Sequence, residues 1–528
     1  MTQPADIITS GGASLGIELG STRIKACLVG ENPSEVLAVG GFEWENQLVD
    51  GLWSYDLDEV WRGLAAAVSD LREQVKTAHG VELSTVRSLG VSAMMHGYLA
   101  FDSDDQLLVP FRTWRNTNTG DAAAQLTELF GVNIPLRWSI AHLQQVILEG
   151  AEHVSNIAFV TTLAGYVHWK LTGEKVLGIG DASGMFPIDT ATRDYDAAMI
   201  KAFDALESSS VLCCSVRELM PKVLVAGDSA GLLTAEGAKL LDPSGGLQPG
   251  ALMCPPEGDA GTGMVATNAV APRTGNISAG TSIFAMVVLE RPLNEVHHEL
   301  DVVTTPLGDT VAMVHCNNGA SELAAWVGMF RRFAEIAGTS HDADQVYDLL
   351  FTEALTGSSD AGGLVAYNYL AGEPITGVGE GRPLFVRTPD SEFTLSNAIR
   401  AQLYGVFGTL SIGMAVLDRE GVELDRMSAH GGMFRTAGVA QRFLAAAINA
   451  PVSVAESASE GGAWGIAVLA AFSASEHTEL ARYLDEVVFS DSRSHTVEPN
   501  PDDLAGYARF MERYRAGLAI ESSAAAAL

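Results

Sequence analysis

Hydrophobic and polar residues follow two periods along this chain, and each period predicts one kind of element. Short apolar runs bounded by turn residues predict buried strands at 15–19, 25–29, 86–94 and 451–455. Apolar residues at helical spacing predict helices at 58–75, 395–416, 440–450 and 466–472, with a mainly helical region from 121 to 171. The pattern therefore predicts strands and helices in both halves of the chain.

The first two strands and the turn between them form a predicted hairpin, 15–29, with the sequence LGIELGSTRIKACLV. Glu18 lies inside its first strand, and Gly20, Ser21 and Thr22 form a turn rich in backbone N–H groups and hydroxyls. Such donors can hold phosphate oxygens while a carboxylate faces the accompanying cation. Gly-Ser-Thr between two strands is also an ordinary hairpin turn, so both interpretations stay open at this point.

A second copy of this pattern opens the other half of the chain. Residues 17–22 (IELGST) align with residues 277–282 (ISAGTS), and an apolar run follows each copy. A repeat that occurs once per half predicts two related domains, which we place at 1–271 and 272–528 on either side of the Ala-Pro junction at 271–272. Two phosphate-facing hairpins, with the carboxylate only in the first, would hold a nucleotide in a cleft between these domains.

Length and charge narrow the classes of function. A chain of 528 residues is too long for one hydrophobic core. With 47% hydrophobic and 18% charged residues, it has enough apolar side chains to form two cores. The formal net charge of −33 disfavours nucleic acid and anionic membranes as partners. An anionic ligand would therefore need local backbone donors and a metal ion.

The cysteines and the N-terminus predict a cytoplasmic protein. Five cysteines show no CxxC pair and no zinc-ligand spacing, which is typical of a reducing compartment. The N-terminus has no basic segment followed by an apolar core, and no run of about 18 apolar residues predicts a membrane span. The chain also lacks the phosphate-binding motif GxxxxGK[ST] and the zinc motif HExxH.

Several short motifs, each weak alone, occur in an order and spacing that resemble those of the FGGY family of carbohydrate kinases, nearest in appearance to the xylulokinases. They are the first hairpin, Met95-His96-Gly97, Leu171-Thr172-Gly173-Glu174, Asp181-Ala182-Ser183, Gly258-Asp259-Ala260, Gly280-Thr281-Ser282, Gly431-Gly432 with Gln441, and the glycines of 461–465. The resemblance spans nearly the whole chain. It implies an α/β fold of two ribonuclease-H-like domains of the actin-like ATPase type, with an ATP and sugar cleft between them.

The resemblance also implies roles for single residues. The reaction would move the γ-phosphoryl group of ATP to a sugar hydroxyl, with Asp259 as the catalytic base and Glu18 and Asp259 near Mg²⁺. The family usually has Asp where this chain has Glu18. The residues expected around the nucleotide are Gly20, Ser21, Thr22, Lys25, Gly280, Thr281 and Ser282 at the phosphates, and Gly431, Gly432 and Gln441 near the adenosine. Lys25 also fits an ordinary solvated strand lysine.

The sugar itself is less well specified. Met95, His96, Trp114, Arg115 and Asn116 are candidate substrate contacts, although each also fits a wall, core or loop-capping role. Two departures from the xylulokinase pattern concern the sugar: Ala260 replaces Asn, and Trp114-Arg115-Asn116-Thr117-Asn118 replaces Trp-x-Asp-x-Arg. We expect a ketopentose such as D-xylulose. Ribulose, fuculose, glycerol or another polyol, and a non-catalytic actin-like nucleotide switch, are the alternatives, and a homodimer is left open.

Overall fold

The strands expected at 15–29 and 86–94 form the centre of a mixed sheet in the computed structural model, which describes residues 3–436, 438–455, 461–492 and 494–527. β1 (Ser14–Leu19) pairs antiparallel with β2 (Arg23–Val29) and parallel with β6 (Ser88–Ala93). The strand order is β13-β6-β1-β2-β3, and β14 also pairs with β6. The outer strands are β3 (Val36–Glu43), β13 (Leu252–Met253) and β14 (Glu257–Gly258).

Two helices cover this sheet, and glycines let them come close. Gly40 of β3 faces α2 (Leu57–His79), because a Cβ there would lie 2.3 Å from the Ala67 carbonyl oxygen. Gly16 of β1 faces α15 (Gly461–Ser473), where a Cβ would lie 2.2 Å from a backbone oxygen of the helix. Gly16 and Glu18 point to the same face of β1, since side chains alternate along a strand. Glu18 therefore lies on the α15 side.

A second sheet repeats this arrangement in the other half. β15 (Thr274–Ala279) pairs antiparallel with β16 (Ile283–Val288) and parallel with β21 (Arg426–His430). The order continues as β18-β16-β15-β21-β22-β23, with β18 (Thr310–Cys316), β22 (Val452–Ala455) and β23 (Ser494–Val497). The internal repeat read from the sequence thus corresponds to two first hairpins with the same strand pairing.

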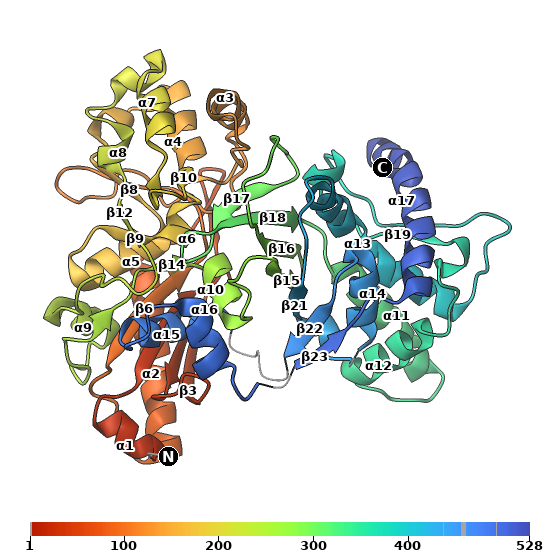
Figure 1. The fold of residues 1–528 in the computed structure, drawn as a ribbon, viewed down its shortest axis with the longest axis horizontal. Coiled ribbons are helices and arrows are strands. Elements are labelled where there is room, and N and C mark those ends of the chain that lie inside the picture. The colour runs from red at the N-terminus through yellow and green to blue at the C-terminus, as the bar shows by residue number, and fades with distance from the viewer. Residues whose placement is uncertain (1–2, 437, 456–460, 493, 528) are drawn as a thin grey trace. The chain divides into compact units, whose positions relative to one another are not determined.

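The long helix α13 (Leu395–Arg419) forms the centre of the second half's core and packs against α14 (Val439–Ile448) and α17 (Pro501–Ala527) (Figure 1). Within the described residues it is the one helix long and apolar enough to cross a membrane, and 83% of its apolar window is buried inside the protein. That burial is typical of a core helix.

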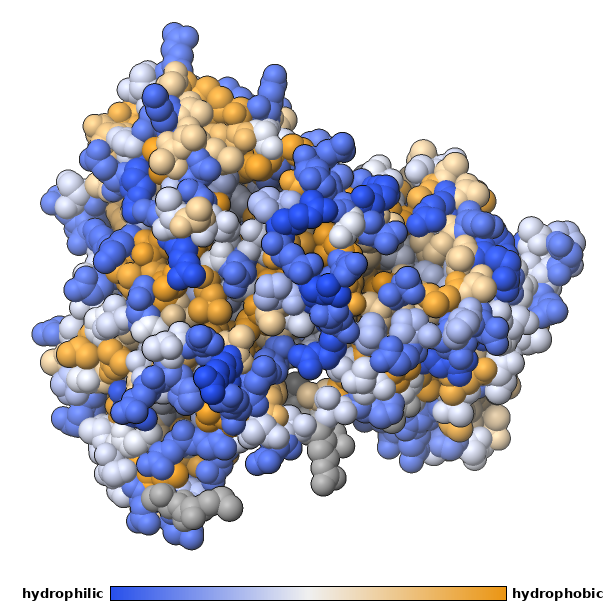
Figure 2. Space-filling view, in the orientation of Figure 1, coloured by the Kyte–Doolittle hydropathy of each residue, from blue (hydrophilic) through white to orange (hydrophobic). Residues whose placement is uncertain are grey.

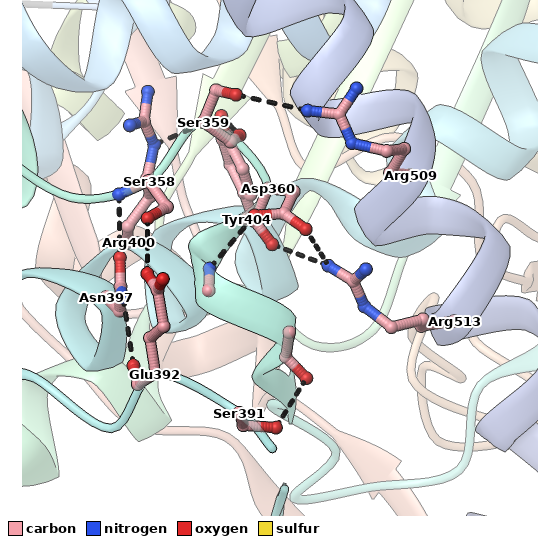
Figure 3. Close-up of polar contacts among 12 residues, drawn as sticks. Ser358, Ser359, Asp360, Ser391, Glu392, Asn397, Arg400, Tyr404, Arg509 and Arg513 are labelled. Atoms are coloured by element: carbon pink, nitrogen blue, oxygen red, sulfur yellow. Dashed lines mark hydrogen bonds and ion pairs between the residues drawn. The ribbon is translucent and has the colours of Figure 1, made fainter. Parts of the chain in front are cut away.

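Polar contacts attach the loop after α12 (Ala343–Ala354) to these helices. The Ser358 N–H donates to Asn397 of α13, and the Tyr404 hydroxyl donates to the Ser359 carbonyl (Figure 3). From α17, Arg513 forms an ion pair with Asp360 at 3.2 Å. The three elements are therefore joined by hydrogen bonds as well as by apolar packing.

The remaining elements are shorter or lie outside the two sheets. In the first half the helices are α1 (Pro4–Thr9), α3 (Gly120–Phe130), α4 (Ser139–Leu148), α5 (Leu163–Thr172), α6 (Ile179–Ala182), α7 (Ala197–Asp204), α8 (Val216–Leu219), α9 (Ala235–Leu241) and α10 (Asp259–Ala266). The strand pairs are β4 (Gln47–Val49) with β5 (Leu52–Ser54), β7 (Leu99–Phe101) with β8 (Phe159–Thr161), β9 (Val176–Gly178) with β12 (Lys222–Leu224), and β10 (Ile188–Asp189) with β11 (Asp194–Tyr195). The later chain adds β17 (Asp301–Thr304), α11 (Ser321–Ile336), α16 (Leu480–Tyr483) and the pair β19 (Val365–Tyr367) with β20 (Leu384–Val386).

The two compact units of the chain are not separated by a single cut. The first unit contains Met1–Val270, Val302–Val311 and Ala458–Ser492, and the second contains Ala271–Asp301, Ala312–Ser457 and Arg493–Leu528. The break after Val270 lies within one residue of the predicted boundary. Two later segments nevertheless belong to the first unit, since α15 packs against β1, β6 and α10.

Hydrophilic and hydrophobic residues both reach the surface of the protein (Figure 2). Hydrophilic residues occupy much of the face drawn in Figure 2.

Candidate active site

The turn of the first hairpin has its carbonyl groups tied back to the protein. The Trp44 indole N–H donates to the Gly20 carbonyl at 2.7 Å, and the Tyr55 hydroxyl donates to the Ser21 carbonyl at 2.6 Å. The Trp44 backbone N–H donates to the Thr22 carbonyl at 3.2 Å. With its acceptors occupied, the turn can offer N–H groups and the Ser21 and Thr22 hydroxyls to an anion.

Glu18 is held at the beginning of α15. The Ala463 backbone N–H donates to its carboxylate, and Lys25 lies opposite it in the strand pair. Burial, followed by the nearby Asp259 carboxylate, raises the pKa of Glu18 to about 7, while Lys25 and the Ala463 N–H act in the opposite direction. Gly462 leaves the space for this side chain, since a Cβ there would lie 2.3 Å from Glu18 Oε1.

Asp259 is the first residue of α10 and follows β14 directly. The Met95 backbone N–H, just beyond the end of β6, donates to Asp259 Oδ1 at 3.2 Å. Burial raises the pKa of Asp259, and the Met95 N–H and Arg137 oppose that rise. Asp259 and Glu18 therefore lie near each other at the carboxyl ends of two parallel strands, where α/β sheets commonly bind ligands.

This carboxylate pair fits a magnesium ion. Burial raises the pKa of both carboxyl groups, and a cation beside them would favour their ionised forms. Among the described residues, no group of three or more His, Cys, Asp or Glu side chains is arranged to hold a metal ion. Mg²⁺ normally takes only one or two protein carboxylates and completes its shell with water and substrate phosphates. Glu18 and Asp259 meet that need.

Two further buried carboxylates lie behind Asp259, and our sequence analysis gave neither of them a role. Asp181 accepts a hydrogen bond from the Thr162 hydroxyl at 2.6 Å, and burial raises its pKa to about 7. Its Oδ1 has no hydrogen-bond partner among the described residues. Glu257 accepts from the backbone N–H groups of Gly180 and Asp181, and burial raises its pKa to about 8. Asp181 belongs to the motif Asp181-Ala182-Ser183, which was the one sign in the sequence that this residue could have a role.

The structure places Met95 and His96 beside Asp259. His96 has a left-handed backbone with φ of 71°, and its ring stacks on Trp138 with the centroids 6.4 Å apart. Its Nδ1 lies 3.3 Å from the Gly184 carbonyl oxygen, an acceptor, so Nδ1 carries the proton of this bond. Both side chains are buried. Their position keeps them as candidate sugar contacts.

The other three sugar candidates contact a different part of the first unit. Asn116 is buried, with its Oδ1 accepting from the Trp53 N–H at 2.8 Å and its Nδ2 donating to the Trp53 carbonyl at 2.8 Å. The Arg115 guanidinium lies 4.1 Å from the centre of the Trp53 ring. Trp114 packs against the hydrophobic core. The Asn116 amide therefore holds the loop onto β5.

The second hairpin has the same tied-back carbonyls as the first. The Gly319 N–H donates to the Thr281 carbonyl at 2.7 Å, and the Ala320 N–H donates to the Gly280 carbonyl at 2.8 Å. The Ser282 carbonyl accepts from the Gly280 N–H at 3.0 Å. The carbonyl groups of this turn are therefore occupied, as in the first hairpin.

A pocket of about 490 Å³ opens in front of this turn. Its lining comes from four segments: Ala279, Gly280 and Thr281; Ala320, Ser321, Leu323 and Ala324; Asp344, Tyr347, Asp348 and Phe351; Gly432, Met433, Arg435 and Thr436. The lining residues of α11 and α12 were not predicted from the sequence, because they look like ordinary positions of amphipathic helices. The lining thus combines a hairpin turn and a helix beginning with two aromatic residues and two carboxylates.

The three adenosine candidates differ in their placement. Gly432 lines the pocket, with open space around its Cα. Gly431 lies against β15, where a Cβ would be 2.1 Å from the Ala279 carbonyl oxygen and where φ is 126°. Gln441 is buried outside the pocket lining, and its Nε2 donates to the Val452 and His495 carbonyls at 2.6 Å each. The Gln441 amide thus joins two strands of the second sheet.

Both halves match models of one protein family. The model described as "FGGY family of carbohydrate kinases, N-terminal domain" matches residues 13–243. The corresponding C-terminal domain model matches residues 275–474.

Individual relatives show the same likeness over nearly the whole chain. The chain is 22% identical to the xylulose kinase of Haemophilus influenzae over 512 residues, which cover 95% of this chain and 98% of that protein. It resembles the solved gluconate kinase from Lactobacillus acidophilus, with a TM-score of 0.78, 18% identity and coverage of 97% and 98%. For the solved xylulose kinase from Rhodospirillum rubrum the TM-score is 0.77 and the identity 21%, and the match covers 96% of this chain and 98% of that one. The predicted two-domain α/β fold is confirmed.

Proposed function

Since the chain belongs to the FGGY family of carbohydrate kinases, we propose that it transfers the γ-phosphoryl group of ATP to a hydroxyl group of a small sugar. The observation that carries this proposal is the position of Asp259. Its carboxylate is fixed by the Met95 N–H, next to Glu18 and to the buried His96 loop.

Asp259 would accept the proton of the sugar hydroxyl. Phosphoryl transfer passes through a loose transition state in which the acceptor needs orientation more than a strong base, so a carboxylate is sufficient. Burial raises the pKa of Asp259 and makes it a better proton acceptor than an exposed aspartate. The Met95 N–H fixes the orientation of Asp259 Oδ1, so the carboxylate is also oriented as the reaction requires.

Glu18 and Asp259 would hold Mg²⁺. When bound, the ion supplies charge neutralisation at the transferring phosphoryl group. The protein adds hydrogen-bond donors of its own. The N–H groups and hydroxyls of Ser21 and Thr22 can donate hydrogen bonds to the phosphate oxygens and so stabilise the same negative charge. Lys25 contributes a positive charge near Glu18.

The nucleotide would occupy the pocket of the second unit. Thr281 and the beginning of α11 at Ser321 offer backbone donors for phosphate oxygens, and Gly280 leaves room for the phosphate to approach. In the same lining, Tyr347 offers apolar surface for the base, and the buried Phe351 ring packs against it. Asp344 and Asp348 offer acceptors for ribose hydroxyls or an exocyclic amino group. This assignment replaces Gln441 with α12 as the adenosine-side element.

For the sugar we propose a ketopentose such as D-xylulose. The relatives named xylulose kinase support it, at 22% identity over nearly the whole chain for the protein of Haemophilus influenzae. Asn116 and Ala260 favour the second candidate, another sugar or polyol, because Asn116 is committed to Trp53 and Ala260 has no polar side chain. An unpaired sugar hydroxyl would cost roughly 1–3 kcal/mol per contact.

One experiment tests the reaction and its substrate together. ADP release is measured by a coupled assay over ketopentoses, other ketoses, glycerol and sugar acids, with Asp259→Asn as the blank. Losing a general base should lower kcat by roughly 10²–10⁴-fold. Asp242→Asn is the matched control. It removes the ion pair of Asp242 with Arg72 far from this chemistry and should leave kcat unchanged.

Two results would contradict the proposal. Full activity of Asp259→Asn would remove Asp259 from catalysis. ATP binding with no acceleration of ADP release by any sugar would favour the non-catalytic nucleotide switch. The cytoplasmic location stays a prediction, and the assembly state stays open.

A further inference from the structure

A buried glutamate lies directly behind the second hairpin, outside the pocket lining. Glu373 is fully buried in a tight turn, where its N–H donates to the Val378 carbonyl at 2.7 Å. Its Oε1 accepts from the Asn317 N–H at 3.4 Å, and its Oε2 accepts from the Asn318 N–H at 3.3 Å. One carboxylate therefore holds two successive backbone groups of the segment between β18 and α11.

Two asparagine side chains extend this contact. Asn318 Oδ1 accepts from the N–H groups of Leu370 and Ala371 at 2.9 Å each, and its Nδ2 donates to Glu373 Oε2 at 3.1 Å. Asn368 Nδ2 donates to the Gly319 carbonyl at 2.8 Å and to the Asn318 carbonyl at 3.2 Å. All three side chains are buried. The segment 317–319 is thus fixed from behind at nearly every polar backbone group.

The next residues of the same segment hold the hairpin. The Gly319 and Ala320 N–H groups are the donors that tie back the Thr281 and Gly280 carbonyls. The fit is tight, because a Cβ on Gly319 would lie 2.3 Å from the Gly280 carbonyl oxygen. A continuous chain of hydrogen bonds therefore leads from Glu373 to the donor turn of the pocket.

We propose that Glu373 is a positioning residue for the nucleotide phosphates: it fixes 317–320, which keep the hairpin carbonyls turned away from the pocket and leave Thr281 to face the ligand. This inference rests on the proposed nucleotide site of the second unit. Without Glu373, the Gly280 and Thr281 carbonyls could rotate toward the pocket and repel phosphate oxygens. A displacement of about 1 Å in such a site can cost a factor of roughly 10².

The test compares Glu373→Ala with Glu373→Gln in the full-length protein. ADP and ATP affinities are measured by titration calorimetry, and KM for ATP and for the best sugar by the coupled assay. We expect Glu373→Ala to weaken nucleotide binding by roughly 10-fold or more while KM for the sugar stays within about twofold. Glu373→Gln keeps an acceptor for Asn318 and should recover most of the loss. Recovery by the glutamine variant marks the hydrogen bond, rather than the volume, as the cause.

Glu420 provides a matched control in the same unit. It is also a buried glutamate that accepts from a loop, through the Asn294 N–H at 2.9 Å, the Asn294 side-chain amide at 2.7 Å and His297 Nε2 at 2.6 Å. Its loop, unlike that of Glu373, does not hold the hairpin. Glu420→Ala should lower thermal stability and leave nucleotide affinity unchanged.

Each outcome is decisive. If Glu373→Ala fails to fold, Asn368→Ala carries the test and should weaken nucleotide binding by severalfold, while Glu373→Gln stays close to the wild-type affinity. Unchanged nucleotide affinity in the folded variants, or an equal loss in Glu420→Ala, would overturn the positioning role. A wild-type protein that binds neither ATP nor ADP would instead overturn the proposed function, so the two failures are distinguishable.

Discussion

Glu18 depends on a residue far from it in sequence. Its carboxylate accepts from the Ala463 N–H at the beginning of α15 and faces Asp259. The glutamate side chain is long enough to reach the helix while its carboxylate stays near Asp259. The backbone N–H groups at a helix N-terminus stabilise a nearby negative charge.

The raised pKa of Glu18 predicts a pH dependence of stability. Burial raises that pKa from 4.5 to about 7, so the native protein binds this proton more tightly than the unfolded chain does. The stability contributed is fully present below pH 4.5 and is lost as the pH rises through about 7. In the absence of metal, Glu18→Gln should flatten the decline of melting temperature between pH 5 and 8.

Magnesium provides the second arm of that measurement. A bound cation favours the ionised carboxylate, so Mg²⁺ should raise the melting temperature of the wild-type protein most at the upper end of this pH range. Glu18→Gln should show little of this effect. Parallel melting curves for the two proteins, with and without Mg²⁺, would argue against a metal-facing Glu18.

Among the elements of the first unit, β1 and α15 approach each other closely. A Cβ at Gly16 would lie 2.2 Å from the Ala463 carbonyl oxygen and 2.5 Å from the Ala467 backbone nitrogen. Because both are backbone atoms, the helix as a whole would have to move. Gly16→Ala should lower the free energy of unfolding by about 1–3 kcal/mol and shift Glu18 away from Asp259.

Gly120 offers a control for that substitution in the same unit. It is the first residue of α3, its φ is not positive, and a Cβ there would meet nothing within 4 Å. Gly120→Ala should leave chemical denaturation and kcat unchanged. A similar loss of stability in both variants would mean that the close approach of β1 and α15 is unimportant.

Local pattern predicted these elements well. The helix expected at 395–416 is α13, Leu395–Arg419, and the hairpin expected at 15–29 is β1 and β2. Both have a clear period or turn signal within a few residues. The repeat at 277–282 also predicted the second hairpin, because two copies of one turn share their chemistry.

Side-chain partners were beyond that method. Asn116 and Gln441 looked like ligand contacts, but their amides bind backbone groups of Trp53 and of Val452 and His495. Such partners are distant in sequence and have no local signal. The α12 side of the pocket had no signal in the sequence, because Tyr347 and Asp348 follow an ordinary helical pattern.

For the whole molecule, the order of the chain differs from the order of its compact units. The first unit takes α15 from the late segment Ala458–Ser492, and it takes Val302–Val311 as well. Thr304, from that second segment, is joined to the first unit by two hydrogen bonds. Its N–H donates to the Ser183 hydroxyl at 3.0 Å, and its own hydroxyl donates to the Ile179 carbonyl at 3.0 Å. Both segments therefore complete the first unit's structure.

This composition predicts how fragments behave. Residues 1–270 alone should fail to fold cooperatively, because the face of β1 and β6 that α15 covers would be exposed. Residues 1–270 joined through a flexible linker to 458–492 should recover much of the near-UV circular dichroism and a cooperative melt. An equally cooperative melt for residues 1–270 alone would show that α15 is dispensable for this unit.

The late position of α15 has a consequence for synthesis on the ribosome. Domains that end where their last strand ends can fold as soon as that strand emerges. Here the hydrophobic surface around Gly16 must wait for the whole intervening chain, which at about 5–20 residues per second is on the order of tens of seconds. During that time the unfinished first unit is a natural substrate for chaperones, and its exposure ends only after α15 has been synthesised.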